Sequence, residues 1–69
     1  MVRVQKIEYL KEDTHEAKVS IFADTKAEVG TSPIEGLPVG YNIELGSTLM
    51  TADADIAFMK SDGSWNWVQ

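Results

Sequence analysis

The last third of this chain is a series of short apolar runs separated by residues that favour turns. It reads YNIELGSTLMTADADIAFMKSDGSWNWVQ, in which Gly46-Ser47, Asp53-Ala54 and Asp62-Gly63 separate the runs. Short apolar runs bounded by such residues are typical of strands, and Asp-Gly between two alternating runs is a strong hairpin signal. The pattern therefore predicts a three-stranded antiparallel meander.

Two-residue turns in this meander predict which residues face one another. A turn at Asp62-Gly63 pairs Phe58 with Trp67, and a turn at Asp53-Ala54 pairs Leu49 with Phe58. The register predicts two apolar faces. The first carries Leu49, Ile56, Phe58, Trp65 and Trp67, and the second, smaller one carries Met50, Ala57, Met59 and Val68.

The first third of the chain predicts an antiparallel hairpin. VRVQKIEYLKE alternates loosely, and Ile7 and Leu10 break the strict period of two, which indicates a strand with a bulge. After the polar stretch KEDTHE, the run AKVSIFAD alternates again. It places Phe22 on the side opposite to Ala17, Val19 and Ile21.

The middle of the chain predicts one helical turn and a connector. DTKAEVG favours a turn of helix over residues 26–28, capped by Asp24 or Thr25 and ended by Gly30. TSPIEGLPVG contains both prolines and reads as a turn-rich connector. We expect the connector to pack on the core through three apolar residues, Ile34, Leu37 and Val39.

These elements predict a single small all-β domain over residues 1–69. We expect a small antiparallel sheet or sandwich of about five strands, built from the N-terminal hairpin and the C-terminal meander, with at most one short helical turn. A core this small leaves only a few kcal/mol of net stability. Because the chain has no cysteine, neither disulfides nor a thiolate zinc site can add to it. We expect the hairpin to cover one face of the meander and a neighbouring subunit to cover the other.

The net charge of −5 argues against nucleic-acid binding, which needs clustered Lys and Arg. Solubility explains the acidity better than mimicry of DNA, because the carboxylates are spread along the chain. No apolar run is long enough for a signal peptide or a membrane span, so we expect a soluble protein made in the cytoplasm.

Few residues are available for catalysis or metal binding. His15 is the only histidine and lies among acids, which is typical of a solvated loop residue. Asp53, Asp55 and Asp62 do not follow the spacing of a calcium loop and are expected to stabilise turns. We therefore expect no enzymatic activity, no cofactor, no metal and no small-molecule substrate.

The two tryptophans near the end of the chain suggest an interface. Alternation places Trp65 and Trp67 on one side of a strand, where they can form core, a subunit or partner interface, or a stacking platform for a ligand. The residues that we expect at a partner interface are Leu49, Met50, Phe58, Met59, Trp65, Trp67 and Val68.

Three segments carry a resemblance to a known group of proteins. SIFADTKAEV, the Pro/Gly-rich connector and GSTLMTADADIAFMKSDGSWNWV together span Ser20 to Val68. In this order they resemble very small proteins encoded in the structural-gene regions of tailed bacteriophages and prophages. The resemblance implies a virion-associated structural protein, such as a capsid decoration or head-fibre component, and it implies no catalytic residue.

The expected function is therefore association within a phage particle, in the head or the tail. The expected partners are phage structural proteins and further copies of this chain, and the expected location is the virion. The alternative is a small acidic phage protein that modulates a host protein.

Overall fold

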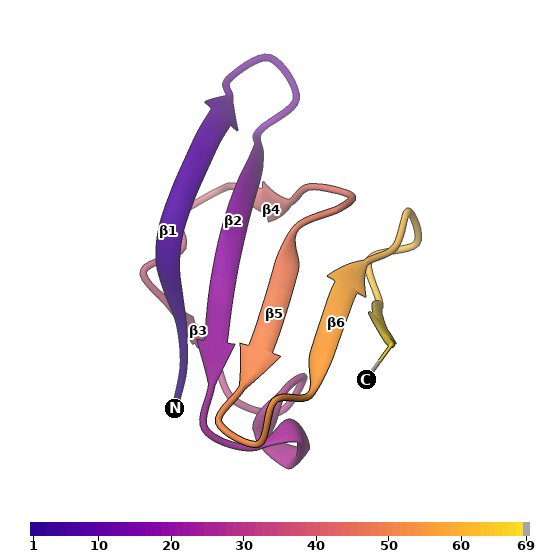
Figure 1. Ribbon diagram of the computed structural model, residues 1–69. Coiled ribbons are helices and arrows are strands. Elements are labelled where there is room, and N and C mark those ends of the chain that lie inside the picture. The colour runs from indigo at the N-terminus through magenta and orange to yellow at the C-terminus, as the bar shows by residue number, and fades with distance from the viewer. Residues whose placement is uncertain (69) are drawn as a thin grey trace.

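The computed structural model describes residues 1–68 and confirms the all-β fold. Within this range, seven strands form one curled sheet in the order β3-β1-β2-β5-β6-β7, with β4 also paired to β2 (Figure 1). The strands are β1 (Val2–Lys11), β2 (Glu16–Ala23), β3 (Ile34–Glu35), β4 (Asn42–Ile43), β5 (Thr48–Thr51), β6 (Ile56–Met59) and β7 (Trp65–Trp67). The sheet is mixed rather than antiparallel throughout, because β3 pairs in parallel with β1, and β4 and β5 pair in parallel with β2.

The N-terminal hairpin is confirmed, including its bulge. β1 and β2 pair antiparallel, and the register shifts twice, between Val4 and Lys6 and between Ile7 and Tyr9. β2 alternates between buried and half-buried residues along its whole length. Its buried residues, which begin at Ala17, define the inner face of the sheet, and the side that carries Phe22 is the outer face.

The segment between β2 and β5, which we call the crossover segment, covers the inner face. It begins with the predicted helical turn η1 (Lys26–Glu28), where the backbone N–H and the hydroxyl of Thr25 both donate to Glu28 Oε2, at 3.1 and 3.0 Å. The chain then pairs with β1 through β3 and returns to β2 through β4, behind the sheet as Figure 1 shows it. The expectation that the hairpin covers the meander is wrong, because β2 lies beside β5 in the same sheet.

The connector packs on the core through only two of its three predicted residues. Ile34 and Leu37 are partly buried against the core. Val39 is 99% exposed, so its predicted packing is wrong. The neighbouring Gly40 has a φ of 85°, so the backbone at this position turns through the left-handed region that glycine favours.

Ser47 fills a break between β4 and β5 along the edge of β2. Its hydroxyl is completely buried, accepts a hydrogen bond from the Val19 N–H at 3.2 Å and donates to the Ala17 carbonyl at 3.4 Å. The Ala17 carbonyl also accepts from the Glu44 N–H at 2.9 Å. The serine side chain thus replaces the backbone group that an unbroken strand would present to β2.

The C-terminal meander is confirmed, but its predicted register is wrong by one residue at both turns. The Gly63 N–H donates to the Lys60 carbonyl, the Lys60 N–H donates to the Ser64 carbonyl, and Gly63 has a φ of 86°. This is a three-residue loop, in which a turn is followed by a left-handed residue. The β5–β6 loop has the same pattern, with Ala54 at a φ of 67°. A three-residue loop shifts the pairing by one position relative to the two-residue turn that we expected.

The shift exchanges residues between the two faces. Leu49 pairs with Ala57, and Ala57 pairs with Trp67, so these three share the inner face. Phe58 pairs with Thr48 and Asn66 on the outer face. Because both turns shift by one, the two errors cancel for Leu49 and Trp67, which lie on the same face as predicted. Only β6 is inverted.

The core lies between the inner face and the crossover segment. Its buried apolar residues are Val2, Ala17, Val19, Ile21, Ala23, Leu49 and Ala57. Both tryptophans, Ile43 and Tyr41 pack against this cluster as partly buried residues. At roughly 25 cal/mol per Å² of buried apolar area, this cluster is the main source of stability.

Candidate association surface

Large apolar side chains gather on the outer face over β2, β5 and β6. Met50 pairs with Phe22 on one side and with Ile56 on the other, so these three residues form a row across the strands. Phe58 lies on the same face one row away, and the Val68 N–H donates to the Ile56 carbonyl at the far end. We call these five residues the outer patch: Phe22, Met50, Ile56, Phe58 and Val68.

The outer patch is exposed to solvent. Met50 is 51% exposed, Phe58 41% and Val68 54%. Phe22 and Ile56 are half-buried by their neighbours. Single exposed apolar residues are ordinary on a protein surface, but a contiguous group usually marks a surface that binds something.

The residues predicted for the partner interface separate onto the two faces. Met50, Phe58 and Val68 belong to the outer patch. Leu49 and Met59 lie on the inner face and are only 1% and 6% exposed. Trp65 and Trp67 also lie on the inner face, where they are half-buried against the core.

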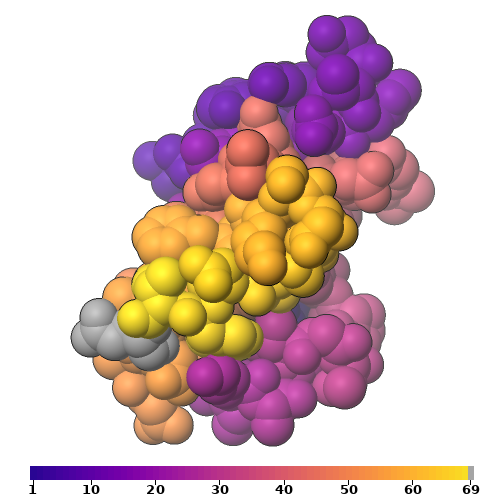
Figure 2. Space-filling view, turned by 90° about the vertical axis from the view of Figure 1, so that its right-hand side faces the viewer, coloured from indigo at the N-terminus to yellow at the C-terminus, as the bar shows by residue number. Residues whose placement is uncertain are grey.

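The tryptophans pack beside the start of the crossover segment. The Lys26 ammonium lies 4.7 Å from the centre of the Trp67 ring. In Figure 2 the C-terminal segment lies directly against the segment that contains η1. Of the three alternatives for these indoles, the packing within the chain is the one that the structure displays.

Sequence reasoning missed two members of the outer patch as interface residues. Phe22 was correctly placed opposite Ala17 and Ile21, and this alternation already marks it as a large apolar side chain pointing away from the core. Ile56 was assigned to the face of Leu49 because of the register error. A prediction that allowed three-residue loops would have placed Ile56, Phe58 and Met50 together.

A hollow opens on the outer face. It has a volume of about 320 Å³, and its lining includes Gln5, Ser20, Thr48, Met50 and Ile56. Polar groups on the β1 side and apolar groups on the β5–β6 side make it amphipathic. Such a hollow can accept one side chain of a docked protein, which is the role of pockets at interface centres.

More cations than carboxylates surround the outer patch on the strands. Arg3 lies over the Phe22 ring at 5.8 Å, and Lys6 pairs with Ser20 on the same face. Lys18 lies 6.0 Å from the Tyr9 ring nearer the hairpin end. Two carboxylates also occupy outward-facing paired positions: Glu35 on β3 is the neighbour of Arg3, and Glu16 lies at the hairpin end, away from the patch.

A polar cluster around Glu44 closes the hairpin end of this face. The Lys11 ammonium lies 2.6 Å from Glu44 Oε1, and this contact, together with the nearby Tyr9 hydroxyl, lowers the pKa of Glu44 below its usual value. The Glu44 carboxylate in turn raises the pKa of Lys11 and, through a hydrogen bond with its hydroxyl, the pKa of Tyr9. The cluster ties β1 to the chain just before β5, so it holds the protruding hairpin to the body.

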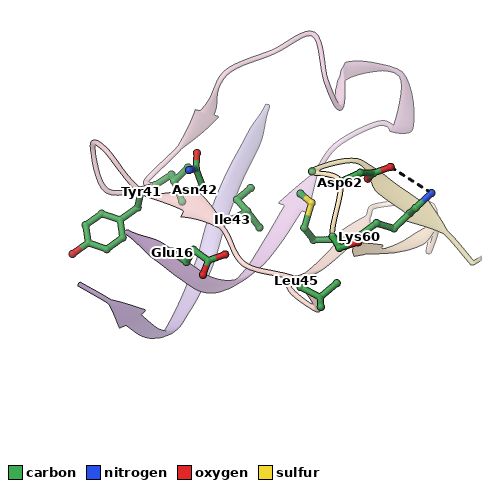
Figure 3. Close-up of a pocket in the computed structure, with 11 residues that line it drawn as sticks. Glu16, Tyr41, Asn42, Ile43, Leu45, Lys60 and Asp62 are labelled. Carbon is green, nitrogen blue, oxygen red and sulfur yellow. Dashed lines mark ion pairs between the residues drawn. The ribbon is translucent and has the colours of Figure 1, made fainter. Parts of the chain in front are cut away.

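A second, larger groove opens on the opposite side of the β4–β5 break. Its volume is about 570 Å³, and Figure 3 shows Ile43 between the polar groups of Glu16 and Asn42 on one side and of Lys60 and Asp62 on the other. Lys60 Nζ and Asp62 Oδ2 are 4.0 Å apart at the rim. The Ser64 hydroxyl and backbone N–H donate to Asp62 and lower its pKa, so this carboxylate is committed to its own turn.

The described residues offer no cluster of metal-binding side chains. His15 lies in the exposed hairpin loop with its ring 5.6 Å from that of Tyr41. Among residues 1–68, no group of three or more His, Asp and Glu side chains is placed to hold a metal ion. The same range contains no helix that is long and apolar enough to cross a membrane.

Comparisons with known proteins add no relative. No protein-family model matches the chain, and no curated protein or solved structure is significantly similar to it. The function therefore has to be argued from the two faces of the sheet.

Proposed function

We propose that this protein is a small structural component of a bacteriophage particle and acts by binding other proteins. One observation carries the proposal: the outer patch exposes Met50, Phe58 and Val68 together on one face of the sheet. Burial of this face would remove apolar area from water, at about 25 cal/mol per Å². The assignment to a phage particle rests on the sequence resemblance of residues 20–68, and the structure is compatible with it.

The arrangement of the patch supports association rather than binding of a small molecule. Its hollow has a volume of about 320 Å³, which is at the lower end of the range of about 300–1,000 Å³ for small-molecule sites. An apolar centre bordered by polar and charged residues is the usual anatomy of a protein interface. Arg3 and Gln5 lie on the β1 side of this centre.

Purified particles test the proposal. Phage particles are isolated on a density gradient from cells that carry the encoding genome, and mass spectrometry measures the chain relative to the major capsid protein. We expect a fixed ratio in the particle fraction that survives a high-salt wash. If the chain is found only in the soluble lysate, the proposal is wrong.

The alternative, a modulator of a host protein, is separated by the same preparation. A modulator would stay in the soluble fraction and bind one host protein in a defined ratio. The carboxylates give little support for DNA mimicry, because exposed ones are scattered over the molecule, with Glu8 on β1, Asp13 in the β1–β2 loop, Glu35 on β3 and Asp62 between β6 and β7. A mimic of the DNA backbone needs regularly spaced charges on one face.

A further inference from the structure

We propose that the outer patch binds the outer patch of a second copy of this chain, so that two sheets pack face to face in a dimer. The proposal deepens the proposed function and rests on its premise that the outer face is an association surface. It names the first partner of that surface, which is the chain itself.

Over β2, β5 and β6, the layers of the fold leave room for a second sheet on one side only. The crossover segment and the two tryptophans cover the inner face, where Leu49 and Ala57 are almost completely buried. The outer face has no such cover within the described residues, although Met50 and Phe58 are each more than 40% exposed there. An apolar sheet face is normally buried against another layer, and two packed sheets are one of the few stable solutions.

The charge distribution favours this face for self-association. Each copy carries a net charge of −5, so most surfaces of two copies repel one another. The strand positions of the outer patch itself carry no charge. Around it, the same face carries four cations, Arg3, Lys6, Lys11 and Lys18, against three carboxylates, Glu16, Glu35 and Glu44. This face is therefore less acidic than the rest of the surface, and two copies repel one another least when they meet through it.

The cations need not oppose one another in such a dimer. Arg3 and Lys6 lie on β1, at one side of the patch, and Phe58 and Val68 lie toward the other side, on β6 and after β7. A two-fold axis parallel to the strands places β1 of one copy over β7 of the other. The uncharged Asn66 is the outward-facing strand residue there.

The size of the face sets the expected strength. The molecule measures 35 × 21 × 20 Å along its principal axes, so its broad side offers on the order of 700 Å². A standard interface buries about 800 Å² on each partner. The dimer would use nearly the whole face and lie at the small end of specific interfaces, which predicts dissociation at micromolar rather than nanomolar concentration.

Sedimentation equilibrium of the full chain tests the proposal. Wild-type protein is measured from about 1 µM to about 1 mM, a range that covers the expected dissociation constant, at low and at high salt. The variants Met50→Glu and Phe58→Glu place a carboxylate in the patch. Val39→Glu makes the same change at a 99% exposed apolar residue of the connector and serves as the matched control.

We expect a dimer for wild type and for Val39→Glu, and at least about tenfold weaker association for both patch variants. Higher salt should strengthen the dimer or leave it unchanged, because it screens the repulsion between two acidic copies. Far-ultraviolet circular dichroism checks that the variants fold. If a variant does not fold, the oligomeric state of the wild-type protein still tests the proposal.

Three results would overturn the proposal. Wild-type protein that stays monomeric up to about 1 mM has no self-association of useful strength. A dimer that both patch variants retain uses another surface. Open-ended assembly that salt dissolves indicates a contact between the basic face of one copy and an acidic surface of the next. A monomer that is nevertheless found in purified particles refutes this proposal alone and leaves the proposed function intact, with a different protein on the patch.

Discussion

Replacement of Ser47 by alanine should destabilise the fold, because it removes the hydroxyl that bridges the break between β4 and β5. The Val19 N–H loses its acceptor at 3.2 Å and stays buried, whereas the Ala17 carbonyl keeps the Glu44 N–H at 2.9 Å. One buried donor without a partner costs about 1–3 kcal/mol. The loss of the longer bond to Ala17, at 3.4 Å, adds less. We therefore expect the free energy of unfolding to fall by about 2 kcal/mol.

This loss is large for a chain of 69 residues. At about 0.05–0.15 kcal/mol per residue, its total stability is roughly 3–10 kcal/mol. Urea denaturation followed by circular dichroism measures the difference. With a slope of about 1–2 kcal/mol per molar urea, the midpoint should fall by about 1–2 M.

The control is Ser61→Ala, at an exposed residue of the β6–β7 loop, which should leave the midpoint unchanged. Hydrogen exchange adds a local measurement, because the Val19 amide should exchange faster in Ser47→Ala than in wild type. Equal midpoints for Ser47→Ala and wild type, together with a protected Val19 amide, would show that another group satisfies this N–H and that the reasoning is wrong.

Three further predictions concern the turns, the indoles and the Glu44 cluster. Ala54 has a φ of 67°, and Gly63 has a φ of 86° with open space around it. Ala54→Gly should therefore stabilise the fold and Gly63→Ala should destabilise it, each by about 1 kcal/mol, which shifts the thermal midpoint by roughly 4–8 °C. Shifts of the same sign would contradict the assignment of the two turns. Trp67→Ala should cost about 2–3 kcal/mol in urea denaturation, below the 3–5 kcal/mol of a fully buried indole, and a loss under about 1 kcal/mol would mean that the ring is not part of the core. Because its partners lower the pKa of Glu44 in the folded state, its ionised form stabilises the protein above the usual glutamate pKa of about 4.3, and this contribution is lost as the pH falls through the lowered value. Glu44→Gln should therefore be less stable than wild type at pH 7, and the difference between their urea midpoints should shrink below about pH 4.3. A difference that stays the same at every pH would contradict the ion pair.

The strands of this fold could be predicted because their residues alternate. Ala17, Val19 and Ile21 are separated by single half-buried residues, and the structure buries all three. The register of the meander could not be predicted from the turn residues, since Asp62-Gly63 suits both a two-residue turn and the three-residue loop that forms. In the three-residue loop only the last residue needs a positive φ, which Gly63 provides.

The parallel pairing of β2 with β5 could not be predicted either. It joins residues that are separated by the whole crossover segment, and nothing in the alternation of Ser20 or Thr48 indicates which strand lies beside them. The hydrogen-bond partners of the Ser47 hydroxyl could not be predicted from the sequence either. A serine after a glycine is a common loop pattern, and only the crossover places this one against β2.

The distribution of side-chain size across the sheet explains why the candidate surface escaped prediction. Burial alone would place the largest apolar residues of each strand on the inner face. The structure instead places Ala17, Ala23 and Ala57 there, each with no exposed surface, because the crossover segment and the indoles lie close above them. The larger Phe22 and Phe58 occupy the outer face, where Phe58 keeps 41% of its surface in water. A monomer gains nothing from this exposure, since polar residues would satisfy the same strand positions. The proposed cover of the outer patch by another protein surface would account for this exposure.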